Sequence, residues 1–162
     1  MLSRLPQLFS LGILLVLGAC GFQLQGAFTT PPEMQRTYVA AVDPYSQFYR
    51  ALQAQMRAAG LELVDDEAAA TATFAINFDE TSQRVLSVSA RNVPTEYEVY
   101  YTIEYTLSAG QKVLLETQTL TLTRDYTYDS MLVLGKAKEE ELLREAIVGD
   151  LVRVVMKQIS TL

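Results

Sequence analysis

Between residues 96 and 107 the chain alternates between polar and apolar side chains, and this pattern constrains the fold more than any other feature. Every second residue is aromatic or aliphatic: Tyr97, Val99, Tyr101, Ile103, Tyr105 and Leu107. Because successive side chains of a strand point to opposite faces, the pattern predicts a long, half-buried β-strand. Ala109-Gly110-Gln111 then predicts a hairpin turn into a second strand over 113–126, which carries threonines on one face: Thr117, Thr119, Thr121 and Thr123. Two long strands joined by a short turn are expected to pair antiparallel.

Shorter strands are predicted upstream, at 36–42, 61–64, 71–78 and 84–91. In the third of these, Phe74, Ile76 and Phe78 alternate with smaller or polar residues, so all three are expected on the buried face. Asn92-Val93-Pro94 is expected to turn the chain between the 84–91 strand and the long strand that follows.

Two amphipathic helices are predicted, over 44–59 and 138–159. For the first, Asp43 is the expected N-cap, Pro44 the first helical residue and Gly60 the C-terminal cap. Its apolar stripe comprises Tyr45, Phe48, Tyr49, Leu52, Met56 and Ala59. The second helix has its stripe at Leu143, Ile147, Leu151, Val155 and Ile159, and Glu139, Glu140 and Glu141 are expected in its first turn.

Together these elements predict an α+β fold. It is a two-layer sandwich with two helices packed on one face of a mixed, mainly antiparallel sheet of about four or five strands. The chain of 162 residues suits one domain of this kind, expected over 36–162.

The first twenty residues differ from the rest of the chain. Arg4 precedes an apolar run over 8–17, which is the pattern of a secretory signal and is too short to span a membrane. A buried core helix is the alternative, but the run has no polar face. Leu17-Gly18-Ala19-Cys20 resembles the bacterial lipobox, and Cys20 is the only cysteine. We therefore expect a cleaved lipoprotein signal peptide over 1–19, lipid attachment at Cys20 and a lipid-anchored tether over 20–35. In the lipoprotein resemblance, Gly21 after the cysteine implies the outer membrane.

Composition argues against catalysis and against nucleic-acid binding. The chain has no histidine, its one cysteine is taken by the anchor, and its net charge of −6 cannot neutralise a run of phosphates. The acidic stretch Asp65-Asp66-Glu67 lacks the spacing of a calcium loop, so we interpret it as a solvated loop and expect no metal. No catalytic residue is assigned, and we expect a protein that is not an enzyme.

Aromatic and cationic residues remain as binding candidates. Tyr97, Tyr101 and Tyr105 either pack under the helices or contribute to an interface, and Tyr100 lies on the opposite face. Arg91 is expected at a hairpin tip, and Lys136 just before the last helix with Lys138 beside it. These cations are either solvated loop charges or a group that recognises phosphates from loops at one end of the domain.

The order and spacing of several motifs resemble the lipopolysaccharide-assembly lipoprotein LptE family. They are Cys20-Gly21-Phe22-Gln23-Leu24, the first helix ending in Gly60-Leu61-Glu62-Leu63, Ser89-Ala90-Arg91-Asn92 with Thr95-Glu96-Tyr97, Arg124-Asp125-Tyr126, and Leu134-Gly135-Lys136 leading into the last helix.

The resemblance implies a non-enzymatic subunit that forms a one-to-one complex with the outer-membrane β-barrel LptD, plugs its lumen and helps assemble it. It also implies binding of lipopolysaccharide for insertion into the outer leaflet, with Arg91 and Lys136 at positions where the family places cations, and Lys138 as a further candidate. The expected location is the outer membrane of a Gram-negative bacterium, facing the periplasm, with no cofactor beyond the acyl and diacylglycerol groups on Cys20. Two alternatives stay open: a lipid-anchored periplasmic module that binds an anionic glycolipid or glycan without a barrel partner, and a lipid-anchored hydrolase.

Overall fold

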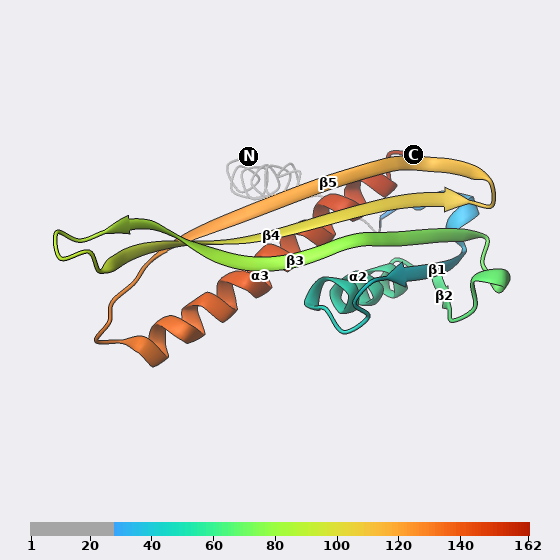
Figure 1. The fold of residues 1–162 in the computed structure, drawn as a ribbon. Coiled ribbons are helices and arrows are strands. Elements are labelled where there is room, and N and C mark those ends of the chain that lie inside the picture. Colours follow the sequence, from blue (N-terminus) through green and yellow to red (C-terminus); the bar gives the residue numbers. More distant parts are fainter. Residues whose placement is uncertain (1–27) are drawn as a thin grey trace, which may run out of the picture.

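The computed structural model describes residues 28–162, so the predicted signal peptide and Cys20 lie outside the described residues. Within these residues, five strands and two α-helices follow one another in the order β1, α2, β2, β3, β4, β5 and α3 (Figure 1). Their bounds are β1 Arg36–Ala41, α2 Gln47–Ala58, β2 Glu62–Val64, β3 Ala72–Val88, β4 Pro94–Ala109, β5 Lys112–Thr127 and α3 Val133–Ile159. Two short 3-10 helices, η2 Pro32–Met34 and η3 Glu67–Ala69, precede β1 and β3.

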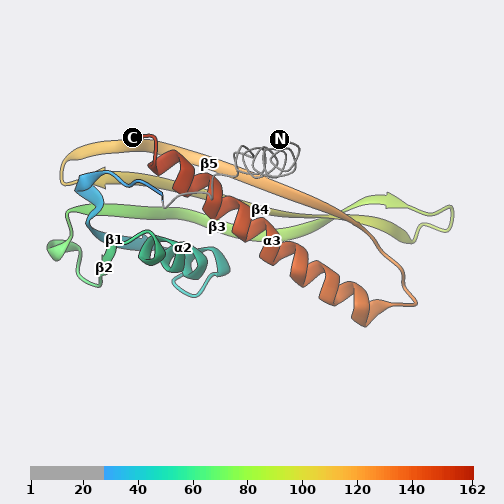
Figure 2. The same ribbon diagram turned by 180° about the vertical axis from the view of Figure 1, so that it is seen from behind.

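The strands form one mixed sheet in the order β2-β1-β3-β4-β5. β1 pairs in parallel with β2 and β3, whereas β3, β4 and β5 form a long antiparallel meander. Both helices lie on the same face of this sheet, and α3 crosses it obliquely (Figure 2). The predicted fold class is confirmed.

The core lies between the two layers. Of the residues predicted to point inward from β4, Tyr97 is partly buried and the others are fully buried. These others, with 0–2% exposure, are Val99, Tyr101, Ile103, Tyr105 and Leu107. They meet Phe48, Leu52 and Met56 of α2 and the stripe of α3 in one continuous cluster. Packing under the helices is therefore confirmed for the tyrosine ladder, whose side chains favour such half-buried strands.

The start of α2 differs from the prediction. Ser46, not Asp43, is the N-cap, and its Oγ accepts a hydrogen bond from the Tyr49 N–H at 3.0 Å. Asp43 instead closes a turn, accepting from the Tyr45 N–H at 2.8 Å, so Tyr45 lies outside the helix and is 82% exposed. The C-terminal prediction is confirmed, because Gly60 follows the Ala59 cap with a φ of +88°.

The predicted strands 71–78 and 84–91 belong to one strand, β3, which ends at Val88, so residues 89–91 lie in the hairpin loop and not in a strand. Ile76 lies opposite Tyr105 and Phe78 opposite Glu104, so Asn77 is an extra residue that shifts the register. A β-bulge of this kind reverses the alternation beyond it. Phe78 is therefore 43% exposed, contrary to the prediction, and Asp79 and Thr81 turn toward the helices.

Helix α3 begins at Val133, five residues before the predicted start. Its first turn carries no amphipathic signal because Val133 and Leu134 are 53% and 88% exposed and do not belong to the core. Glu139, Glu140 and Glu141 consequently occupy the second and third turns, not the first, and Lys136 lies within the helix rather than before it. Over residues 28–162, no helix is both long and apolar enough to cross a bilayer.

Candidate functional site

Arg91 lies at the tip of the β3–β4 hairpin, where the loop is closed by its own backbone. The Ser89 N–H donates to the Val93 carbonyl at 2.8 Å, and the Asn92 N–H donates to the Ser89 carbonyl at 2.9 Å. Asn92 has a φ of 59°, a left-handed conformation that asparagine tolerates. The Arg91 side chain is exposed, and no carboxylate within residues 28–162 forms an ion pair with it.

Lys136 and Lys138 differ from Arg91 because each already has a carboxylate partner. Lys136 Nζ lies 2.7 Å from Glu139 Oε2, and Lys138 Nζ lies 2.7 Å from Glu141 Oε2. The hydrogen bond to Glu141 raises the pKa of Lys138. The Lys136 side chain is only 18% exposed, so an anion reaching it must compete with Glu139.

The three predicted cations lie at one end of the molecule but not in one cluster. Both ribbon views place the β3–β4 loop and the start of α3 at the same end, on separate segments (Figures 1 and 2). In the described part of the chain, no hydrogen bond links Arg91 to either lysine. The predicted placement at one end is thus correct, whereas the placement of Lys136 on a loop is wrong.

A polar network fixes the first half of α3 against the sheet at this end. Arg144 donates to Glu140 Oε1 at 2.6 Å and also to the Thr81 hydroxyl. The Tyr126 hydroxyl lies 3.0 Å from Gln83 Oε1 and 3.5 Å from Glu140 Oε2. Burial, and then the Glu140 carboxylate, raise the pKa of Tyr126 to about 12. Sequence reasoning missed this network because Thr81 and Gln83 face the helices only after the bulge at residue 77.

Exposed apolar side chains surround the same end. On the hairpin they are Val85, Leu86, Val88 and Val93. On the loop before α3 and in the first turn of α3 they are Met131, Leu132, Val133 and Leu134. Met131 and Leu134 are each 88% exposed. Apolar residues gathered beside cations form a surface suited to an amphiphile, which has an anionic head and apolar chains.

The sheet face opposite the helices is polar and rich in hydroxyl groups. Thr102 and Thr121 pair across β4 and β5 at 2.9 Å, and Thr106 lies 3.2 Å from Thr117. Asn77 donates to the Thr106 hydroxyl at 3.1 Å. The predicted threonine face of β5 is confirmed, and it forms a wettable surface rather than a second core.

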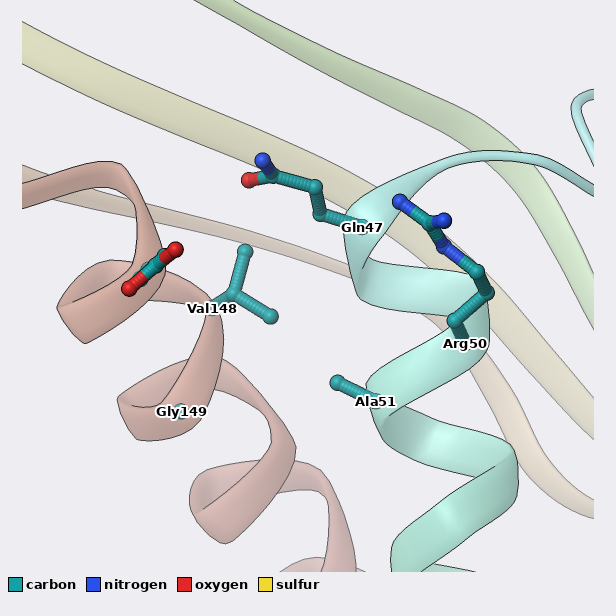
Figure 3. Close-up of a pocket in the computed structure, with 6 residues that line it drawn as sticks. Gln47, Arg50, Ala51, Val148 and Gly149 are labelled. Carbon is teal, nitrogen blue, oxygen red and sulfur yellow. The ribbon is translucent and has the colours of Figure 1, made fainter. Parts of the chain in front are cut away.

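An open groove of about 460 Å³ separates α2 from α3 (Figure 3). Ala51 and Val148 point into it, and Arg50 lies on its α2 wall. Gln47, Glu145 and Gly149 complete the lining. A nucleophile with an adjacent base is not found among these residues.

The acidic stretch at 65–67 has structural contacts. Asp66 caps η3 by accepting from the Ala68 N–H at 3.0 Å, and Glu67 accepts from the Thr73 hydroxyl at 3.3 Å. From residue 28 onward, no group of three or more histidine, cysteine or acidic residues is placed to hold a metal ion.

The chain is similar to curated lipoproteins over most of its length. It is 26% identical over 156 residues to the LPS-assembly lipoprotein LptE of Pectobacterium atrosepticum, covering 91% of this chain and 80% of the relative. To the LPS-assembly lipoprotein LptE of Yersinia enterocolitica it is 27% identical over 133 residues, covering 81% of this chain but 63% of that relative. The match therefore spans less than two thirds of the Yersinia protein.

Solved structures share the fold. The solution structure of a lipoprotein B from Nitrosomonas europaea has a TM-score of 0.72 and 25% sequence identity, over 86% of this chain and 90% of that one. The rare lipoprotein B of Shewanella oneidensis has a TM-score of 0.67 and 20% identity, over 78% and 94% of the two chains. The model of the LptE family, described as lipopolysaccharide-assembly, matches residues 34–159, which include both layers of the fold and all three candidate cations. The chain belongs to the LptE family of lipopolysaccharide-assembly lipoproteins.

Proposed function

We propose that this protein is anchored to the outer membrane through lipid on Cys20, plugs and helps assemble the LptD β-barrel, and binds lipopolysaccharide for insertion into the outer leaflet. Family membership supports a role in lipopolysaccharide assembly. The barrel partner, the lipid anchor and the ligand contact are the parts that experiments must test.

The proposal that the protein binds lipopolysaccharide rests on the exposure of Arg91 and on its lack of an ion-pair partner in the described residues. Its guanidinium is exposed at a closed loop and is not neutralised by any carboxylate in residues 28–162. A guanidinium can donate two parallel hydrogen bonds to a phosphate, which makes arginine a strong phosphate ligand. Lys136 and Lys138 contribute after their glutamate partners are displaced, so we expect Arg91 to contribute most of the affinity.

The polar sheet face supports the barrel proposal. The interiors of outer-membrane barrels are polar, and a plug that fills one needs a surface able to exchange hydrogen bonds with it. The threonine hydroxyls of β4 and β5 provide such a surface on these two strands.

Two measurements on protein purified from membranes test the two parts. Lipopolysaccharide binding should fall by about tenfold or more in Arg91→Ala, consistent with the loss of a charge-assisted contact, and further in Arg91→Ala/Lys136→Ala. Lys112→Ala is the matched control, because Lys112 is the first residue of β5, beside the β4–β5 turn at the opposite end of the sheet. Equal binding by Arg91→Ala and Lys112→Ala would remove the tip from the ligand site.

Co-purification separates the barrel partnership from the alternatives. The Cys20→Ala variant should still associate with a large β-barrel when it is exported by another signal. Binding of lipopolysaccharide without any barrel would favour a periplasmic binding module. Hydrolysis of the ligand would favour a lipid-anchored enzyme.

A further inference from the structure

Strand β1 has an open edge over its second half. On one side β3 pairs with Thr37–Ala41, but on the other side β2 pairs only with Arg36–Tyr38. Residues 39–41 therefore have no strand neighbour on the β2 side within the described chain. An unpaired strand edge presents backbone N–H and C=O groups that another extended chain can pair with.

A pocket of about 290 Å³ lies beside this open edge. Its walls come from β1, from the end of β2 with Asp65, and from one face of α2. Three polar side chains of α2 line it in a hydrogen-bonded row: the Gln53 amide donates to the Tyr49 hydroxyl at 2.6 Å, and Arg57 donates to Gln53 Oε1 at 3.1 Å. The row holds Arg57 in the wall of the pocket.

Apolar residues also line the pocket and flank it. Ala41 and Pro44 line the pocket, and their sequence neighbours Val42 and Tyr45 are 79% and 82% exposed. Exposed side chains of this size beside a pocket are typical of surfaces that a partner covers.

The charge of α2 favours an anionic partner. The helix carries Arg50 and Arg57 and no acidic residue, in a chain whose net charge is −6. Neither arginine forms an ion pair within the described residues. Asp65 on the facing wall would repel a carboxylate there, so the anionic group of a ligand is expected on the Arg57 side.

We propose that this pocket binds an extended, acidic peptide segment of a partner protein, which adds to the edge of β1 at Val39–Ala41 and places a carboxylate beside Arg57. The three open residues span about 10 Å at the usual rise of a strand, which is enough for a short peptide to form a local ladder. The backbone groups at the edge of β1 favour a peptide in an extended conformation, and the positive charge of Arg57 favours a peptide that carries a carboxylate. This inference does not depend on the lipopolysaccharide contact at Arg91, which lies on the β3–β4 hairpin.

The probe is fluorescein-labelled Gly-Val-Thr-Val-Glu with a free carboxyl end, titrated by fluorescence anisotropy against the protein purified from membranes in detergent. We expect saturable binding that weakens about tenfold in Arg57→Gln, the loss expected for one charge-assisted hydrogen bond. Arg50→Gln is the matched control, because Arg50 lies on the same helix but lines the groove between α2 and α3. The peptide should bind this variant within about twofold of its affinity for the wild type, the size of an ordinary surface effect.

A second probe with the same sequence and N-methylated backbone amides tests whether the peptide binds as an added strand. Its backbone has lost the N–H groups that would donate hydrogen bonds to the edge of β1. It should bind at least about tenfold more weakly, and only the unmodified peptide should slow hydrogen exchange at residues 39–41. Equal binding of the two probes would overturn the proposal, as would an absence of saturation up to millimolar peptide. Displacement of the peptide by methyl glucoside would overturn it in favour of a saccharide site.

Discussion

The N-cap of α2 offers the sharpest test of the structure, because sequence and structure name different residues. Sequence alone favours Asp43, whereas the structure assigns the cap to Ser46, whose Oγ also donates to Asp79 of β3. Asp79 in turn accepts from the buried Tyr101 hydroxyl at 2.6 Å. Ser46 therefore joins the first turn of the helix to the centre of the sheet.

Ser46→Ala removes two interactions. Loss of an N-cap costs about 1 kcal/mol, and loss of a hydrogen bond to a charged group costs about 1.5 kcal/mol. The free energy of unfolding should fall by about 2–3 kcal/mol. Asp43→Ala removes only a turn contact at an exposed position and should cost about 0.5 kcal/mol or less.

Urea unfolding of both variants, followed by circular dichroism, measures the difference directly. Tyr101→Phe combined with Ser46→Ala should give a free-energy change that departs from the sum of the single changes, since both residues bond the same carboxylate. Equal destabilisation by Asp43→Ala and Ser46→Ala would refute the cap assignment. Strict additivity of Ser46→Ala and Tyr101→Phe would refute the link through Asp79.

Three further outcomes follow from the charged and phenolic groups. Hydrogen bonds from Arg124 and Arg153 lower the pKa of Asp150. The stability that the Asp150 carboxylate contributes should therefore be complete above the ordinary pKa of 3.8 and be lost as the pH falls through the lower pKa of the folded state. Urea unfolding across pH should show that the stability difference between wild type and Asp150→Asn shrinks in this acidic range. Burial raises the pKa of Tyr105 from 10.0 to about 12, so stability should fall as the pH rises through that interval. In Tyr105→Phe this fall in stability should be smaller, and absorbance at alkaline pH should show less phenolate formation. Arg144→Met leaves Glu140 without its ion-pair partner and should increase hydrogen exchange in the first half of α3 more than at its C-terminal end; uniform exchange along the helix would contradict the role of this pair.

Much of the fold is local in origin and was predictable. The alternation over 97–107 and the helical stripes of α2 and α3 indicate which side of each element meets the core. The structure confirms them except at Tyr45, which lies outside α2 and is exposed. The extra residue Asn77 was not predictable, because a bulge exists only relative to the partner strand β4. Its consequence is that Phe78 is exposed and Asp79 faces the helices.

The candidate site shows the same division. The sequence determined the strand and helix periods, the hairpin that presents Arg91 and the choice of one polar sheet face, because each depends on neighbouring residues. Only the tertiary structure decided the partners: Ser46 meets Asp79 across 33 residues, and Arg144 meets Thr81 across 63. Local patterns report burial, but the choice of hydrogen-bond and charge partners depends on which distant segments the sheet brings together, and that information is absent from any short stretch of the chain.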